Sequence, residues 1–228
     1  MTNGNLTKGS VRLVAFVWAI SIFLVLPMVY AWEPTPKEIR QAASSGLPKL
    51  TGSIPEKDLR FYGFAKRSET ERAQLREGIR VYTIQPQMLF AYKKGMDAKR
   101  MITPTDIWFF PVVTEGKSAS LLTVDRMKGN WEAVAIGSSG LARQLETIES
   151  HFPPAGGYAL YFVRVFQAQS DFMFIVKDKT LTIVPLESAI VGLNLRSQQN
   201  RYGNLTYTPE EIIPRLIPVV RENMRTQD

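Results

Sequence analysis

The chain has 228 residues, of which 45% are hydrophobic, with no cysteine, a single histidine (His151) and a formal net charge of +7. The missing cysteines exclude disulfides, lipid attachment at a cysteine, thiol nucleophiles and cysteine-ligated metal sites. A single histidine excludes multi-histidine metal sites and leaves a serine–histidine–acid triad only one position to use. The sequence therefore predicts no cofactor and no tightly bound transition metal.

The first 31 residues have the pattern of a secretory signal peptide. Lys8 and Arg12 precede an uncharged run, residues 13–31, which a proline interrupts and which ends in a small-x-small pattern at Val29 and Ala31. Signal peptidase accepts such an end, so we expect cleavage after Ala31. The alternative is an uncleaved N-terminal membrane anchor, because the run is just long enough to span a bilayer.

Both alternatives place residues 32–228 outside the cytoplasm, in a periplasmic or extracellular location, because the two basic residues hold the N-terminus inside. Lys8 and Arg12 account for two of the seven net positive charges, which leaves +5 for the exported part. This mild excess suits an anionic partner such as an envelope polymer, and we expect no specific binding of nucleic acid.

Residues 32–78 are predicted to form an N-terminal helical segment. One helix should begin with a capping box at Thr35 and end by Gly46, and a short charged helix should cover 68–78. The remaining residues, 79–228, are predicted to form an α+β domain, since strand patterns dominate it.

The strand patterns, of which 79–84 alternates in the β manner, are separated by short turns at Glu115-Gly116, Lys128-Gly129 and Lys177-Asp178-Lys179-Thr180. The predicted strands are 79–84, 107–113, 118–125, 131–136, 158–166, 172–176 and 181–186. A helix is expected between the two groups of strands, with Leu141, Leu145 and Ile148 on its apolar face. A last helix should open with a capping box at Thr208, and its prolines, Pro214 and Pro218, should kink or split it.

This order predicts an α+β fold with one or more antiparallel meander sheets and helices packed on one face. Two strand regions are apolar on both faces, which leaves Trp108, Phe110, Phe172 and Phe174 as candidates for an apolar interface or groove. The alternative is that a second layer or the N-terminal helices cover them.

Residues Gly137, Ser138, Ser139 and Gly140 form a candidate anion-binding loop. They follow a strand and open a helix, where backbone N–H groups and the helix dipole favour negative charge. An ordinary capped turn is the alternative. A second glycine-containing tripeptide, Gly116-Lys117-Ser118, is no phosphate-binding loop, because it sits in a hairpin and Pro111 replaces the required glycine.

Asp125 and Glu132 form the one candidate carboxylate pair. If Lys128-Gly129 is a two-residue turn, Asp125 faces Glu132 across the hairpin, and like charges opposed in this way can supply acid–base chemistry or bind a metal ion. Solvated surface charges are the alternative, and no catalytic residue is otherwise indicated.

The composition favours an exported, non-enzymatic binding or interaction module that uses an apolar sheet face and a mildly basic surface. Its partner would be another protein, an anionic envelope polymer or an apolar ligand, and residues 13–31 would contact the membrane only if uncleaved. The alternatives are a small envelope hydrolase that uses carboxylates such as Asp125 and Glu132, and a structural subunit that forms a homodimer.

Overall fold

The computed structural model describes residue 1, residues 32–195 and residues 206–226, so the predicted signal segment lies outside the described residues. Within these ranges, no helix is long and apolar enough to cross a membrane. The helices and 3-10 turns are α1 (Lys37–Gly52), η1 (Glu56–Asp58), α2 (Arg67–Glu71), α3 (Pro86–Phe90), η2 (Ala98–Met101), α4 (Ser139–His151), η3 (Pro154–Gly156), η4 (Phe166–Ala168), α5 (Glu187–Gly192) and α6 (Pro209–Arg225). The strands are β1 (Gln74–Leu75), β2 (Ile79–Ile84), β3 (Ile102–Thr114), β4 (Lys117–Met127), β5 (Asn130–Gly137), β6 (Ala159–Val165), β7 (Ser170–Lys177) and β8 (Thr180–Pro185).

The strands form one mixed sheet in the order β5-β4-β3-β2-β6-β7-β8. The short strand β1 pairs with the last part of β3, where Gln74 lies opposite Val113. All pairs are antiparallel except β2 with β6, where Val81 lies opposite Phe162 in a parallel register. The predicted α+β class is confirmed. The two predicted meanders, β3-β4-β5 and β6-β7-β8, lie in the same sheet, and β2 joins them.

The three predicted hairpin turns are also confirmed. Each is a pair of residues with positive φ: Glu115-Gly116 at 51° and 79°, Lys128-Gly129 at 50° and 90°, and Asp178-Lys179 at 49° and 71°. Two consecutive positive φ values are the type I′ geometry, whose twist matches that of the flanking strands.

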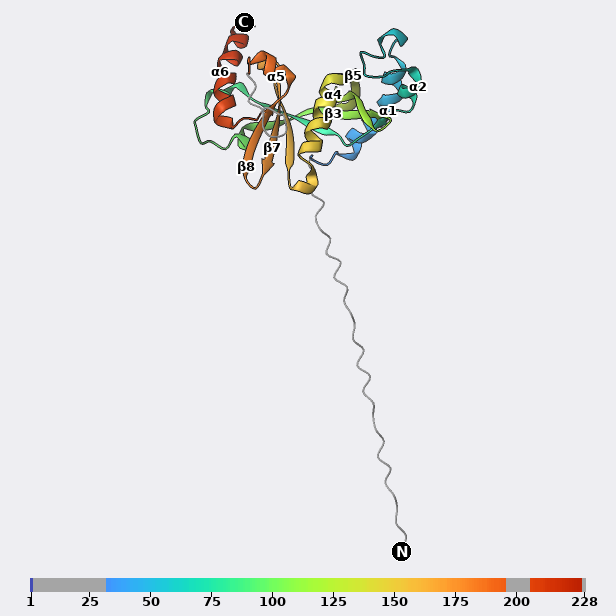
Figure 1. Cartoon of the computed structure of the whole chain (residues 1–228), viewed down its shortest axis with the longest axis horizontal. Coiled ribbons are helices and arrows are strands. Elements are labelled where there is room, and N and C mark those ends of the chain that lie inside the picture. Colours follow the sequence, from blue (N-terminus) through green and yellow to red (C-terminus); the bar gives the residue numbers. More distant parts are fainter. Residues whose placement is uncertain (2–31, 196–205, 227–228) are drawn as a thin grey trace.

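Helices cover both faces of the sheet. Neighbouring residues of a strand point to opposite sides, and residues of both sides pack against helices. On β3, Phe109 belongs to the cluster that contains Leu145 of α4, whereas Phe110 belongs to the cluster that contains Ile39 of α1. On β7, Phe174 packs in the cluster of α6. Figure 1 shows α6 at one end of the molecule and α1 with α2 at the other, with α4 between them.

The candidate apolar groove is corrected by this arrangement. Trp108 and Phe110 are 1% and 0% exposed in the cluster with α1, and Phe172 and Phe174 are 0% and 1% exposed in the cluster with α6. The four side chains are buried by helices of their own chain, so they offer no open surface to a ligand. The N-terminal helices provide part of this cover, as the alternative interpretation held.

The first helix differs from its prediction at both ends. α1 continues through Gly46 and Pro48 to Gly52. A side chain at position 46 would place its Cβ 2.2 Å from the Cβ of Ala133 on β5, so glycine lets the helix lie directly against the edge of the sheet. Thr35 caps no helix: its hydroxyl accepts from the N–H of Gly78 at 2.9 Å and its own N–H donates to Glu77.

The charged segment that follows is also less helical than predicted. Only Arg67–Glu71 is helical, and Gln74–Leu75 instead adds the short strand β1 to the sheet. At the other end of the chain, Thr208 and Glu211 form the predicted capping box. The helix that they open, α6, runs unbroken through Pro214 and Pro218, both of which are exposed.

Candidate functional site

A polar cavity of about 410 Å³ opens where the turn between β3 and β4 meets the first half of α4, and we call it the hairpin pocket. The end of β3, the turn and the start of β4 contribute Thr114, Glu115, Lys117, Ser118 and Ala119. α4 contributes Arg143 and Glu146, and the segment before and within α2 contributes Gly63 and Glu69. Gly63 has φ +90°, and a Cβ there would lie 2.0 Å from the carbonyl oxygen of Ala119, so only glycine permits this close approach.

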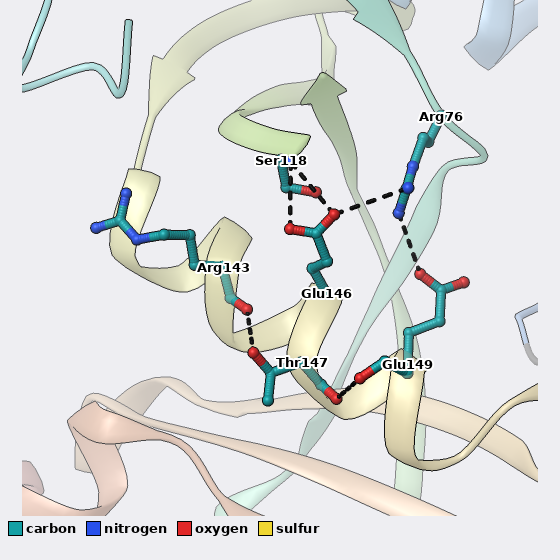
Figure 2. A network of polar contacts seen from close by, with 7 residues as sticks. Arg76, Ser118, Arg143, Glu146, Thr147 and Glu149 are labelled. Carbon is teal, nitrogen blue, oxygen red and sulfur yellow. Dashed lines mark hydrogen bonds and ion pairs between the residues drawn. The ribbon is translucent and has the colours of Figure 1, made fainter. Parts of the chain in front are cut away.

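Glu146 holds the inner wall of the hairpin pocket together. Its two carboxylate oxygens accept from the backbone N–H of Ser118 at 3.3 and 3.2 Å. The guanidinium of Arg76 lies 3.7 Å from Glu146 and 3.7 Å from Glu149, one turn further along α4 (Figure 2). Glu146 therefore connects α4 to the β3–β4 hairpin and is already matched by a cation and an N–H donor.

The other two acids of the wall also have donors. Glu69 is 8% exposed and accepts from the backbone N–H of Ala65 at 2.7 Å. Glu115, in the turn, lies 3.5 Å from Arg72. Each carboxylate that lines the hairpin pocket is thus engaged by a group of the same chain.

The two basic side chains of the wall differ from the acids in this respect. Lys117 and Arg143 are both exposed and line the hairpin pocket, and neither has an ion-pair partner among the described residues. Figure 2 shows the guanidinium of Arg143 directed away from Glu146. Arg143 lies in the first turns of α4, where the helix dipole adds to the positive potential. The wall of the hairpin pocket thus carries both signs of charge, with the three acids Glu69, Glu115 and Glu146 beside these two cations.

Two hydroxyl groups lie in the same wall. The Oγ1 atom of Thr114 is buried and has no hydrogen-bond partner among the described residues. Ser118, which is 5% exposed, uses its backbone N–H for Glu146, and its hydroxyl has no partner within the described ranges. A buried hydroxyl without a partner costs free energy, and because the Oγ1 atom of Thr114 is buried from solvent, it is not presented to the hairpin pocket.

The predicted anion-binding loop lies at the start of α4, one turn before Arg143. Ser138 is the N-cap residue in a left-handed conformation with φ 56°, and its side chain makes no capping bond. The hydroxyl of Ser139 donates to the carbonyl of Phe61 at 3.3 Å. Gly137 accepts from Ser120 at 2.9 Å, so this loop is tied to its neighbours, and Gly140 has open space beside it. An anion role for the loop stays a prediction.

Asp125 and Glu132 face each other across the β4–β5 hairpin in the predicted register. Asp125 accepts from the N–H of its neighbour Arg126 at 2.7 Å. The pair does not line the hairpin pocket, nor a second cavity of about 390 Å³ between the end of α1 and α2. No use of the pair in catalysis or metal binding is indicated by its surroundings.

Two further observations concern possible metal ligands and the histidine in the described part of the chain. No group of three or more histidine or acidic side chains there is arranged to hold a metal ion. The Nδ1 atom of His151 lies 2.8 Å from the carbonyl oxygen of Thr147, one turn back in α4.

The sequence interpretation did not predict that Lys117 and Arg143 line one pocket. Lys117 was set aside with its tripeptide, and no pocket role was predicted for Arg143. The usable signal was that a basic hairpin tip precedes a helix with a basic residue in its first turns. Together, these residues define an exposed pocket with polar walls on an α+β scaffold. Comparison of the chain with protein-family models, with curated proteins and with solved structures gave no match.

Proposed function

We propose that this chain is an exported, non-enzymatic binding module that holds its ligand in the hairpin pocket. The observation that carries the proposal is the composition of the pocket wall: its acids accept hydrogen bonds or ion pairs from the same chain, while the exposed Lys117 and Arg143 have no ion-pair partner among the described residues. Groups that are available but fixed on rigid elements are suited to binding.

The sequence favoured binding through an apolar sheet face, but helices cover that face. The proposal therefore places binding in the hairpin pocket. A hydrolase would need a free carboxylate or a base beside the ligand, but the carboxylates of the hairpin pocket are bound to Ser118, Ala65 and Arg72.

Export is the first half of the proposal, and intact mass tests it. Protein recovered from the extracytoplasmic fraction should have the mass of a chain whose first residue is Trp32. A mass that retains residues 1–31 would support the membrane anchor instead, and recovery of the chain from the cytoplasm alone would contradict export.

Ligand binding without turnover is the second half. A panel of small molecules and polymer fragments, anionic, neutral and apolar, should include compounds that raise the melting temperature of the protein. The double variant Lys117→Ala/Arg143→Ala should lose this response, whereas Lys94→Ala, which changes an exposed lysine outside the pocket, should keep it. Hydrolysis of any bound compound that is abolished in a folded Glu146→Gln variant would make the protein an enzyme and overturn the proposal.

A further inference from the structure

We propose that one end of the molecule docks onto an anionic lipid membrane. This strand-end surface consists of the segments that follow β2, β6 and β8, residues 85–101, 166–169 and 187–195, together with the C-terminal end of α6, residues 221–226. The inference goes beyond the hairpin pocket and stands independently of it. The convergence of the four segments, their exposed apolar side chains and their excess of positive charge carry it.

The topology of the sheet brings the first three segments to one end. β2 and β6 are parallel, so the segments that follow them leave the sheet at the same end. β7 is antiparallel to both β6 and β8, so β8 ends there too. A Cβ at Gly192, the last residue of α5, would lie 3.3 Å from the hydroxyl oxygen of Ser170, which places α5 beside the segment that follows β6.

The C-terminal end of α6 reaches the same place. The guanidinium carbon of Arg221 lies 5.4 Å from the centre of the ring of Phe90, the last residue of α3. The side-chain amide of Asn223 donates to the carbonyl oxygen of Gln167 in η4 at 2.7 Å. Figure 1 shows α5 and the C-terminal part of α6 at this end of the molecule. The four segments are therefore neighbours in space and form one surface.

Each of these segments exposes a large apolar side chain. The exposed fractions are 41% for Phe90, 41% for Phe166, 75% for Val191 and 37% for Met224. Single exposed apolar side chains are ordinary on a protein surface, whereas several on neighbouring segments mark an interaction site. The apolar face of α6 itself is buried in the core, so the protruding side chains, rather than a whole helix face, would enter the membrane.

The strand-end surface is also basic. Its four segments carry six lysine and arginine residues against three acidic residues, a net charge of +3. Two of the six basic residues pair with acids of their own segment. The other four, Lys93, Lys94, Lys99 and Arg221, have no ion-pair partner among the residues that the structure describes. Anionic headgroups attract such side chains, and each one near the membrane raises the affinity roughly fivefold.

The combination of charged and apolar groups selects a lipid surface as the partner. Phenylalanine, valine and methionine side chains can enter the boundary between headgroups and acyl chains, while lysine and arginine side chains contact the lipid phosphates. A hydrophilic polyanion would use the charges but leave the apolar side chains in water. A second copy of the chain, related by a two-fold axis, would bring two surfaces of the same positive charge together.

The surface does not depend on the predicted signal segment. The hydroxyl of Thr35 accepts from the N–H of Gly78, immediately before β2, so the first residues of the folded body lie near the start of that strand. The strand-end surface lies beyond the other end of β2. Membrane contact through it therefore uses different residues from 13–31 and is expected of the processed protein.

Sedimentation with lipid vesicles tests the proposal on the protein as it is recovered from cells. Vesicles of equal parts phosphatidylglycerol and phosphatidylcholine should bind the protein, more weakly at high salt because the ions screen the charges. Vesicles of phosphatidylcholine alone should bind it at least about tenfold more weakly. Hydrogen exchange should slow in the four segments when the anionic vesicles are added. Equal binding to both kinds of vesicle, or no binding to the anionic kind, would overturn the proposal.

One pair of variants tests the apolar contact. Val191→Ser should weaken binding to the anionic vesicles by about three- to fivefold, because one apolar side chain no longer leaves water. Phe61→Ser is the matched control: its ring is 79% exposed in the segment before α2, at the other end of the molecule, so binding should not change. Because both side chains are mostly exposed, both variants are expected to fold, which melting curves verify.

A second pair of variants tests the charge. Lys93→Glu/Lys94→Glu should weaken binding to the anionic vesicles by at least about tenfold. Lys57→Glu/Lys66→Glu makes the same change in net charge on exposed lysines in η1 and just before α2, and it should bind as the wild type does. Equal binding by the two double variants would refute the strand-end surface. The hairpin pocket fails separately, through the melting-temperature response to small molecules, which both double variants should retain.

Discussion

Gly46→Ala is a direct test of how α1 lies on the sheet. In an isolated helix, this change would stabilise by about 0.5–1 kcal/mol, because glycine is a poor helix former. In the protein, the new Cβ would lie 2.2 Å from the Cβ of Ala133, whereas carbon atoms in contact are about 3.5–4.0 Å apart. The helix and the edge strand would have to separate by more than about 1 Å.

Overpacking of this kind typically costs about 1–3 kcal/mol, which exceeds the gain in helix propensity. We expect a net loss of about 1–2 kcal/mol, or roughly 2–8 °C in melting temperature for a domain of this size. Urea denaturation and thermal melts measure it. Gly52→Ala is the matched control: it lies at the end of the same helix with nothing within 4 Å of its Cβ, so it should not destabilise.

A second change identifies the contact. Ala133→Gly removes the clashing atom, and the next neighbour of a Cβ at position 46 is then the Cα of residue 133 at 3.5 Å. Gly46→Ala combined with Ala133→Gly should therefore be more stable than the sum of the single changes predicts. If Gly46→Ala proves as stable as the wild type, or if the two changes are simply additive, the close packing of α1 on β5 is refuted.

Two further predictions concern the core and the last helix. Phe110→Ala should lower the free energy of unfolding by about 3–5 kcal/mol, because the ring is fully buried beneath α1. Asp125→Ala and Glu132→Ala should each change it by less than about 1 kcal/mol. Melting curves for the three variants measure these effects, and a severe loss in either acidic variant would contradict the prediction. Hydrogen bonds from Thr208, first from its backbone N–H and then from its hydroxyl, hold the pKa of Glu211 below its ordinary value of 4.5. The cap therefore stabilises the fold above that pH and loses its effect as pH falls through the lowered pKa. The difference in stability between wild type and Glu211→Gln should shrink on acidification, and a difference that is constant from pH 7 to pH 3 would refute the ionised cap.

The sequence predicted elements whose determinants are local. Type I′ turns such as Lys128-Gly129 follow from a glycine at the second position, which takes positive φ without a steric cost, and the cap at Thr208 follows from Glu211 three residues later. α1 was predicted too short because the reason for Gly46 is Ala133, which is distant in the chain. The parallel pair of β2 and β6 was missed for the same reason, since Val81 meets Phe162 only after the β3–β4–β5 hairpins and α4 have intervened.

The hairpin pocket depends still more on tertiary arrangement. Lys117 lies at a hairpin tip and Arg143 on a helix, and both look like ordinary solvated charges in the sequence. Both lie in the wall of one pocket beside Glu146, which Arg76 and the N–H of Ser118 engage, an arrangement that only the packed α4 brings about. Sequence patterns can identify which residues carry charge, but the structure decides which charges remain for a ligand.

The N-terminal residues of the described body connect this fold to the proposed export. Trp32 is 8% exposed in the cluster beneath α4, while the carboxylate of Glu33 accepts from Tyr82 at 2.7 Å and pairs with Arg80 at 3.1 Å. Tyr82 and Arg80 alternate with the α4-facing residues of β2, so Trp32 and Glu33 engage opposite faces of the sheet. Cleavage after Ala31 would keep both contacts, whereas cleavage two residues later would remove both. The processing position predicted from the signal pattern is therefore also the latest one that leaves this packing intact.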